Sequence, residues 1–472
     1  MNAKQKMISL CSFFLSSSHP SPTKGNNKIL AIFAPRRARL ATLIAVLASV
    51  VGTGTALVAG PGTAFADETF SKASTITVPG GLNSFDIGFV DPKLGRYFLA
   101  DRTNKTIDQV KTSDNSITQL AAGSLVGPNG VITANDHTEV WAADSADPVT
   151  KTSSVKVISL ATGTVTHTID TGGQGRSDEL CEDPQHHVVL VANDAEEDLF
   201  LTFISTKSYK IVRKIHLDGS DRNAQNIKAT NGIEQCQWNP RTGKIYLAIP
   251  QVGGTPGTND TPGVVLMINP ASMKVQKVFP IESGFVAASG ATLATADCLG
   301  PQGLAIGPQR EILLGCSNKG QGSVIINELD GSLIHSLPGL NGNDEVWYNP
   351  GDNHYFLAGS NHKVGTDPTT PQLSVVDQKA DNGNEDAAAT TAAGSHSVAA
   401  DPVKNQVYVP GNKAATTLCG GATGCIAVFT TTSDDPGVCR SPGTPAHGQG
   451  KKGDPVFLRH VCPDNNSQHH ED

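Results

Sequence analysis

Seven polar residues recur at equivalent positions along the chain and are the strongest candidates for chemistry. Each stands about five residues before an Asp-Pro, Asn-Pro or similar turn, and mostly apolar residues follow it. The seven residues are Asp86, Asn129, Asp178, Glu234, Gln302, Asp344 and His396. If the fold brings these positions together, their side chains form one ring of carboxylates, amides and a single imidazole.

The composition of this ring suits a hard divalent cation. Oxygen ligands are what Ca²⁺ and Mg²⁺ take, and one histidine among carboxylates also admits Mn²⁺ or Zn²⁺. The expected metal ligands are the four acidic members of the ring: Asp86, Asp178, Glu234 and Asp344. A cation held there polarises a carbonyl and activates water, as lactone hydrolysis requires. Glu234 or His396 is the expected general base.

Further polar residues of the ring and its rim are expected to bind a ligand. They are Asn129, Gln302, Glu179, Glu345, Asp101 and Asp144. Glu179 and Glu345 directly follow ring members, whereas Asp101 and Asp144 end the second strand of their repeats. Asp and Asn also serve as turn residues, and polar residues at a wet opening need no function. These structural interpretations therefore stay open beside the functional one.

The elements that must position these residues are repeated pairs of short strands. Seven copies of one pattern run from FDIGFVDPKLGRYFLAD at Phe85 to SHSVAADPVKNQVYVPGN at Ser395. In each copy an apolar strand leads into the turn, and a second strand rich in Val, Leu, Ile and Tyr follows it. Six steps over the 310 residues from Asp86 to His396 give about 52 residues per copy, close to the length of a propeller blade.

A second pair of alternating strands follows most copies, as in VKVISLATGTVTHTID at 155–170. Alternating strands separated by turn residues indicate antiparallel hairpins. Four strands in each of seven units predict an all-β, seven-bladed β-propeller whose first strands line a central channel. The last unit lacks a fourth strand, and a spare strand at 73–79 is expected to complete it and close the ring. Residues 380–394 of the sixth unit show no convincing fourth strand.

The segments NPRTGKIYLAIP and SVKVISLATGTVTHTID resemble the two halves of the YVTN-type β-propeller repeat, and the likeness covers about 73–430. This resemblance implies the propeller architecture without fixing a chemistry. More loosely, the chain is similar to gluconolactonase-like and virginiamycin-lyase-like propellers. Those families use a divalent cation in the central channel, so this looser resemblance also implies a metal there.

The N-terminal segment has the features of a secretory signal peptide. Residues 40–59 are uncharged and apolar, Arg36, Arg37 and Arg39 precede them, and Ala64-Phe65-Ala66 follows. Residues 1–66 are therefore expected to be a targeting segment, 67–430 the propeller and 431–472 a flexible tail. The alternative is an uncleaved membrane anchor, because twenty apolar residues can span a bilayer.

Eight cysteines remain after residue 66, and an even number in an exported protein predicts disulfides. Connectivity does not follow from spacing alone. The simplest pairs are Cys419–Cys425, Cys298–Cys316 and Cys439–Cys462, which leaves Cys181 to Cys236.

Charge excludes one class of partner. Residues 1–66 carry seven Lys and Arg and no acid, so removing them from a net charge of −8 leaves −15 on the rest. A body this acidic does not neutralise phosphates, which argues against nucleic-acid binding. We expect a secreted, periplasmic or cell-surface monomer that binds a small molecule, peptide or glycan at the channel mouth. The alternative is a divalent-metal-dependent hydrolase or lyase, lactonase-like, at the same place.

Overall fold

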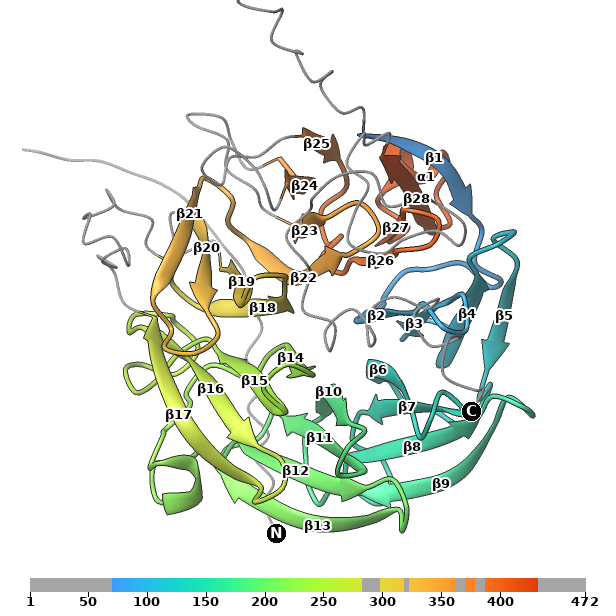
Figure 1. Ribbon diagram of the computed structural model, residues 1–472. Coiled ribbons are helices and arrows are strands. Elements are labelled where there is room, and N and C mark those ends of the chain that lie inside the picture. The colour runs from blue at the N-terminus through green and yellow to red at the C-terminus, as the bar shows by residue number, and fades with distance from the viewer. Residues whose placement is uncertain (1–69, 282–297, 318–321, 361–369, 378–386, 432–472) are drawn as a thin grey trace, which may run out of the picture. The chain divides into compact units, whose positions relative to one another are not determined.

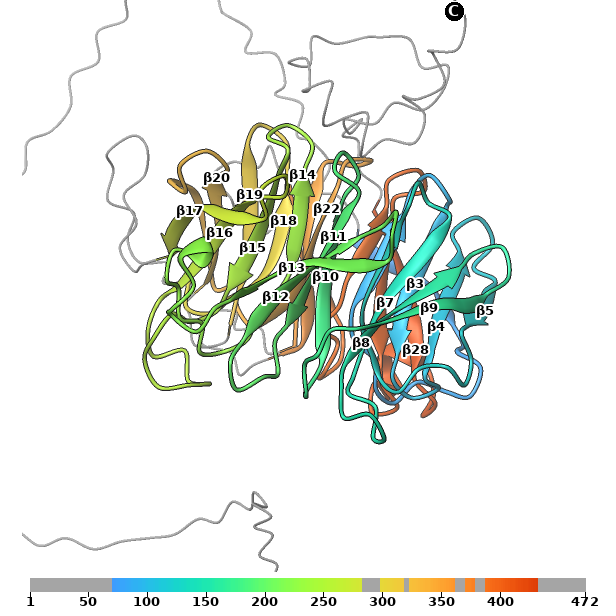
Figure 2. The same ribbon diagram turned by 90° about the horizontal axis from the view of Figure 1, so that it is seen from below.

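A computed structural model of the chain describes residues 70–281, 298–317, 322–360, 370–377 and 387–431. These residues form seven antiparallel four-stranded sheets that are arranged as the blades of a β-propeller (Figure 1). The first strands of neighbouring blades contact one another around the centre. Figure 2, the view from the side, shows the strands running between the two faces of the propeller. The predicted fold class, an all-β seven-bladed propeller, is confirmed.

The strands of blades 1 to 4 follow one another from the channel outward. Blade 1 contains β2 (Gly88–Asp91), β3 (Arg96–Asp101), β4 (Thr106–Lys111) and β5 (Ile117–Leu120). Blade 2 contains β6 (Pro128–Ala134), β7 (Glu139–Asp144), β8 (Ser154–Ser159) and β9 (Thr164–Asp170). Blade 3 contains β10 (Ser177–Asp183), β11 (Val188–Asn193), β12 (Phe200–Ser205) and β13 (Lys210–His216). Blade 4 contains β14 (Cys236–Asn239), β15 (Lys244–Ile249), β16 (Gly263–Asn269) and β17 (Lys274–Ile281).

The remaining blades have the same order, except that the last one borrows its outer strand. Blade 5 contains β18 (Pro301–Ile306), β19 (Glu311–Cys316), β20 (Gly322–Asn327) and β21 (Leu333–Pro338). Blade 6 contains β22 (Asn343–Asn349), β23 (His354–Gly359), β24 (Gln372–Asp377) and β25 (Ala387–Thr390). Blade 7 contains β26 (Ala399–Asp401), β27 (Gln406–Gly411), β28 (Cys425–Thr431) and β1 (Phe70–Ile76). Two short helices, η1 (Arg222–Ala224) and α1 (Thr416–Cys419), lie in connections between strands.

The Asp-Pro and Asn-Pro turns end the first strand of five blades by a common device. In blade 1, Asp91 Oδ1 accepts hydrogen bonds from the backbone nitrogens of Lys93 (2.9 Å) and Leu94 (3.1 Å). Asp183, Asn239, Asn349 and Asp401 cap their turns through the same kind of bond. Four residues after each capping residue the backbone has a positive φ, and Gly or Asn fills four of these five positions. The repeated turn motif therefore fixes where each first strand stops.

The ring closes through pairing of the two ends of the propeller sequence. Strand β1 pairs antiparallel with β28, from Phe70 opposite Thr431 to Ile76 opposite Ile426. The Phe70 ring stacks on Phe429 at 5.3 Å, which fixes the outer strand against the blade. The predicted closing strand is confirmed, although it begins three residues earlier than expected, at 70 rather than 73.

Blade 6 corrects one expectation. The Ala-rich segment Ala387–Thr390 pairs with β24 as a fourth strand, β25. Its sequence gave no strand signal because alanine has low β-propensity, and here pairing with the adjacent strand decides the conformation.

Three disulfides join parts of the propeller, and all three were predicted pairs: Cys181–Cys236, Cys298–Cys316 and Cys419–Cys425. The first links the channel-lining strands β10 and β14 of blades 3 and 4. Three disulfides are typical of a protein that folds in an oxidising compartment. The predicted Cys439–Cys462 pair, the signal segment and the tail lie outside the described residues. Among the helices of the described part, none is long and apolar enough to cross a membrane.

Candidate functional site

β-bulges direct the predicted ring residues of four blades toward the propeller axis. The pairing of β6, β10, β18 and β22 with the second strand shifts register across the ring position, for example between Ser177 and Leu180. A bulge bends a strand locally and re-aims the side chain at the extra residue. In blades 1, 4 and 7 the ring residue lies two or three residues before the first strand. The backbone nitrogens of Asp86 and Glu234 still donate to the second strand, at Ala100 and Ala248 (both 3.0 Å).

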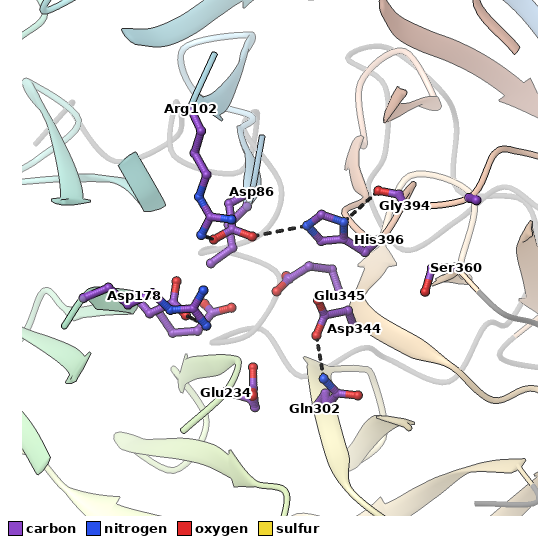
Figure 3. A pocket seen from close by; sticks show the side chains of 14 residues that line it. Asp86, Arg102, Asp178, Glu234, Gln302, Asp344, Glu345, Ser360, Gly394 and His396 are labelled. Carbon is purple, nitrogen blue, oxygen red and sulfur yellow. Dashed lines mark hydrogen bonds and ion pairs between the residues drawn. The ribbon is translucent and has the colours of Figure 1, made fainter. Parts of the chain in front are cut away.

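The ring residues meet at one end of the channel, where they line a cavity of about 560 Å³. Figure 3 shows their side chains converging from different blades. Six of the predicted seven ring members line it, together with both predicted rim glutamates. The lining residues include Asp86, Arg102, Arg176, Asp178, Glu179, Glu234, Gln302, Asp344, Glu345, Ser360 and His396.

Arg102 and Asn129 fix the carboxylate of Asp86 on one side of the cavity. Arg102 Nη2 forms an ion pair with Asp86 Oδ2. The same guanidinium donates to Asn129 Oδ1 from Nε (3.0 Å) and Nη2 (2.6 Å). Asn129 is itself 1% exposed and donates to the carbonyl oxygen of Ser177 (2.7 Å), so it positions Arg102 rather than lining the cavity.

Arg176 forms a second cationic point between two aspartates. Its Nη2 lies 2.9 Å from Asp178 Oδ2 and 2.5 Å from Asp194 Oδ2, and its Nε donates to Asp194 Oδ1 at 2.9 Å. The bond to Asp194 is bidentate, which orients the planar guanidinium. Even so, burial and the charges of Asp194 and Asp86 raise the pKa of Asp178 well above its usual value.

His396 is half-buried, and both of its ring nitrogens have partners. Its Nδ1 donates to the carbonyl oxygen of Gly394 (2.7 Å), and its Nε2 lies 3.2 Å from Asp86 Oδ1 (Figure 3). Its ring stacks on Phe85. Burial lowers the pKa of His396, but the bond to Asp86 and the charge of Asp344 outweigh burial and raise it to about 9. In return, His396 and Arg102 overcome the effect of burial on Asp86 and lower its pKa. His396 therefore carries a proton on both nitrogens at neutral pH.

Burial and crowding raise the pKa values of the other carboxyl groups that line the cavity. Burial, and next the charge of Glu345, raises the pKa of Glu179 well above its usual value; burial and the charge of Asp344 do the same for Glu234. Burial and nearby acids also raise the pKa values of Asp344 and Glu345. Glu179 and Glu345, from blades 3 and 6, are neighbours among these groups, and each affects the pKa of the other.

Two carboxylate oxygens that belong to cavity-lining residues have no hydrogen-bond partner. They are Asp178 Oδ1 and Glu345 Oε2, and both residues are more than nine-tenths buried, at 4% exposed. By contrast, Asp344 has a partner: its Oδ1 accepts a hydrogen bond from Gln302 Nε2 (2.8 Å). Leaving a buried acceptor unsatisfied costs about 1–3 kcal/mol, a cost that a donor from water or from a ligand removes.

Two predicted binding residues lie away from the cavity lining. Asp101 is fully buried and accepts from the backbone nitrogen (3.0 Å) and Nδ2 (2.5 Å) of Asn104. Asp144 is also fully buried and accepts from the backbone nitrogens of Val126 (3.0 Å) and Gly127 (2.8 Å). Both carboxylates cap loops, which is the turn-forming interpretation that the sequence left open.

Sequence reasoning missed the arginines and Ser360. Arg102 directly follows Asp101, and Arg176 stands two residues before Asp178, so both are adjacent to the aligned positions. Each occurs in only one copy of the repeat, and a search for columns shared by all copies passes over them. The one available signal was a basic residue beside a ring position in a strongly acidic chain.

The described side chains include no group of three or more His, Cys, Asp or Glu placed to hold a metal ion. Two of the predicted ligands, Asp86 and Asp178, are engaged by arginines instead. We therefore derive no chemical step through a metal, and the predicted cation stays a prediction.

Comparisons with known proteins support the architecture. No protein-family model matches the sequence, and no curated protein matches it. Among solved structures, 1407 chains match. One is a chain of "Crystal Structure of Mitotic Checkpoint Complex", with a TM-score of 0.54 and 12% identity over 83% of this chain and 99% of that chain. At this identity the likeness establishes the propeller fold alone, and the YVTN-type subtype stays a prediction.

Proposed function

We propose that this propeller is an exported binding module that takes a positively charged group of its ligand into the acidic cavity at the channel end. The observation that carries the proposal is the pair of buried, unpartnered carboxylate oxygens on Asp178 and Glu345. An ammonium or guanidinium group supplies the donors that these acceptors lack. Binding to proteins or peptides is the common use of propellers, and the solved neighbour is itself part of a protein complex.

The charge balance of the cavity favours a cation over an anion. Six carboxyl groups face three basic side chains. The three basic groups are already engaged: Arg102 with Asp86, Arg176 with two aspartates, and His396 with Asp86. In the described part of the chain, no Lys, Arg or His forms an ion pair with Glu179, Glu234 or Glu345. Those three glutamates therefore keep their capacity to bind positive charge.

Binding should be coupled to proton release. The raised pKa values of Glu179, Glu234 and Glu345 mean that these groups carry protons at a pH where exposed glutamates do not. An entering cation stabilises the ionised forms and lowers their pKa values. Protons therefore leave as the ligand arrives, and affinity rises with pH.

Isothermal titration calorimetry with two probes of equal length and opposite charge tests this proposal. Butylammonium chloride should bind with a heat that changes between buffers of different ionisation enthalpy, whereas sodium butyrate should not bind. Glu234→Gln should weaken butylammonium binding by about tenfold, equivalent to about 1.4 kcal/mol. Glu197→Gln, an exposed site outside the cavity, is the matched control and should bind as wild type does.

Two results would overturn the proposal. One is butyrate binding as tightly as butylammonium, and the other is binding that Glu234→Gln leaves unchanged. Titration with CaCl₂, MgCl₂, MnCl₂ and ZnCl₂ separates the alternative function. A divalent ion that binds tightly and excludes butylammonium would support the alternative function, a metal-dependent hydrolase. Screens of lactones and esters would then follow.

A further inference from the structure

A second cavity continues from the acidic one along the propeller axis. It has a volume of about 370 Å³, and residues from all seven blades line it. In Figure 1, which looks along the axis, the first strands β2, β6, β10, β14, β18, β22 and β26 surround this region. Ile87 and Glu179 line both cavities, so the two spaces meet at the level of these residues.

The walls of this second cavity are largely apolar. Next to the ring, its lining includes Leu180, Leu304, Val346 and the Cys181–Cys236 disulfide. Farther along, it is lined by Phe89, Trp238 and Trp347, and the rings of Phe89 and Trp347 meet edge to face at 5.9 Å. At the far end lie prolines of the strand-ending turns: Pro92, Pro184, Pro240, Pro350 and Pro402.

Glu179 lies at the junction between the cavities, and Glu345 lines the acidic cavity together with it. The two residues come from blades 3 and 6 and are 5% and 4% exposed. Glu345 Oε2 has no hydrogen-bond partner. A single positive group placed between the two carboxyl groups stabilises their ionised forms and donates to that oxygen. Anything attached to this group then lies beside the apolar wall.

We propose that the ligand is an amphipathic cation, with its ammonium or guanidinium group between Glu179 and Glu345 and its apolar part in the axial channel. This inference rests on the proposed function, because it needs the acidic cavity to accept a cation. The channel has the size of small-molecule sites, which run from about 300 to 1,000 Å³. Its length follows the first strands, about five residues at about 3.3 Å each, or about 16 Å.

Apolar contact should dominate the affinity difference between short and long ligands. Each methylene that leaves water for the channel adds to the affinity, so a ligand with several methylenes in the channel binds more tightly than one that stops at the junction. Charge decides where the head lies, and the apolar wall decides how much the tail adds. Both parts are required for tight binding.

An alkylammonium series tests the inference on the purified protein. Affinities of ethyl-, butyl- and octylammonium chloride are measured by calorimetry, with octanol as the neutral control. Octylammonium should bind at least about tenfold more tightly than ethylammonium, and octanol should bind far more weakly than octylammonium. The Glu179→Gln/Glu345→Gln double variant should lose octylammonium binding, while Glu197→Gln should keep it.

Tryptophan fluorescence locates the tail independently. Of the three tryptophans, Trp238 and Trp347 line the channel, whereas Trp141 is buried in blade 2. 8-Bromooctylammonium should therefore quench fluorescence by contact with the bromine, and 2-bromoethylammonium should not. In a Trp238→Phe/Trp347→Phe variant the quenching should disappear while octylammonium still binds, because Phe keeps the wall apolar.

The outcomes separate this inference from the proposed function. If ethyl- and octylammonium bind equally and no quenching occurs, the head site stands and the channel inference is wrong. If octanol binds as tightly as octylammonium, the channel takes apolar molecules without a charged head, which also overturns the inference. If no ammonium probe binds, both proposals fail.

Discussion

The ion pair between His396 and Asp86 gives a sharp prediction about proton binding. Replacing Asp86 with Asn removes the charge of Asp86 and the carboxylate that bonds to His396, both of which raise the pKa of His396. Burial still lowers this pKa, while the charge of Asp344 and the bond to Gly394 still raise it. The wild-type pKa of about 9 lies about 2.5 units above the ordinary 6.5, which corresponds to about 3 kcal/mol at 1.36 kcal/mol per unit. Asp86→Asn should therefore lower the His396 pKa by about 1–3 units.

The sign for stability follows from the same shift. The pKa of His396 is higher in the folded state than in the unfolded chain, so its contribution is complete below about pH 6.5. It is lost as the pH rises through about 9. Wild type should lose up to about 3 kcal/mol of unfolding free energy from this group between pH 6 and pH 10. His396→Gln should show a correspondingly flatter dependence.

Nitrogen-detected NMR of imidazole-labelled protein, titrated from pH 5 to pH 10.5, measures the group directly. The His396 signals are assigned by their absence in His396→Gln. His335 is an internal reference of the opposite sign, because burial lowers its pKa. A wild-type His396 midpoint at or below 6.5, or one that Asp86→Asn leaves in place, would refute the electrostatic account of this site.

Two other predictions concern stability outside the cavity. Burial and the neighbouring Asp101 raise the pKa of Asp108 to about 8, so the folded state loses stability as the pH rises toward 8. Asp108→Asn should gain up to about 4 kcal/mol over wild type between pH 5 and pH 8, measured as melting temperature at both values; an equal difference at both would contradict this. Replacing both cysteines by serine should cost about 4 kcal/mol for Cys181–Cys236 and about 2 for Cys419–Cys425, because the first closes 55 residues and the second 6. Equal losses in chemical denaturation would contradict the chain-entropy reasoning.

The fold was predictable because its signals are local and repeated. The turn at Asp91, with its capping carboxylate and a glycine at positive φ four residues later, recurs with small changes in other blades. Alternation within each hairpin then sets which side chains are buried. Strand β25 was not predicted, because its residues Ala387–Thr390 carry no such local signal. Only their pairing with β24 makes them a strand.

The candidate site was only half predictable, for a related reason. Alignment of the copies finds what the blades share, so it found Glu234 and Asp344 without any knowledge of their contacts. It could not find Arg102, because an arginine stands at this position in only one copy of the repeat. Its contact with Asp86 appears only in the folded structure. The same alignment selected Asp101, because a carboxylate that caps a loop and one that faces a cavity look identical in sequence.

Backbone hydrogen bonds also join neighbouring blades at the ring positions, beside side-chain contacts such as the bond from Asn129 to Ser177. The amide of Ile87 donates to the carbonyl of Asn129 (3.2 Å), and the amide of Glu345 donates to the carbonyl of His396 (3.0 Å). These bonds form whatever the side chains are. Burying carboxyl groups against one another costs stability. Hydroxyl or amide side chains could line a hydrated channel mouth without that cost. The backbone bonds do not require acidic side chains at these positions, which supports the proposal of a positively charged ligand.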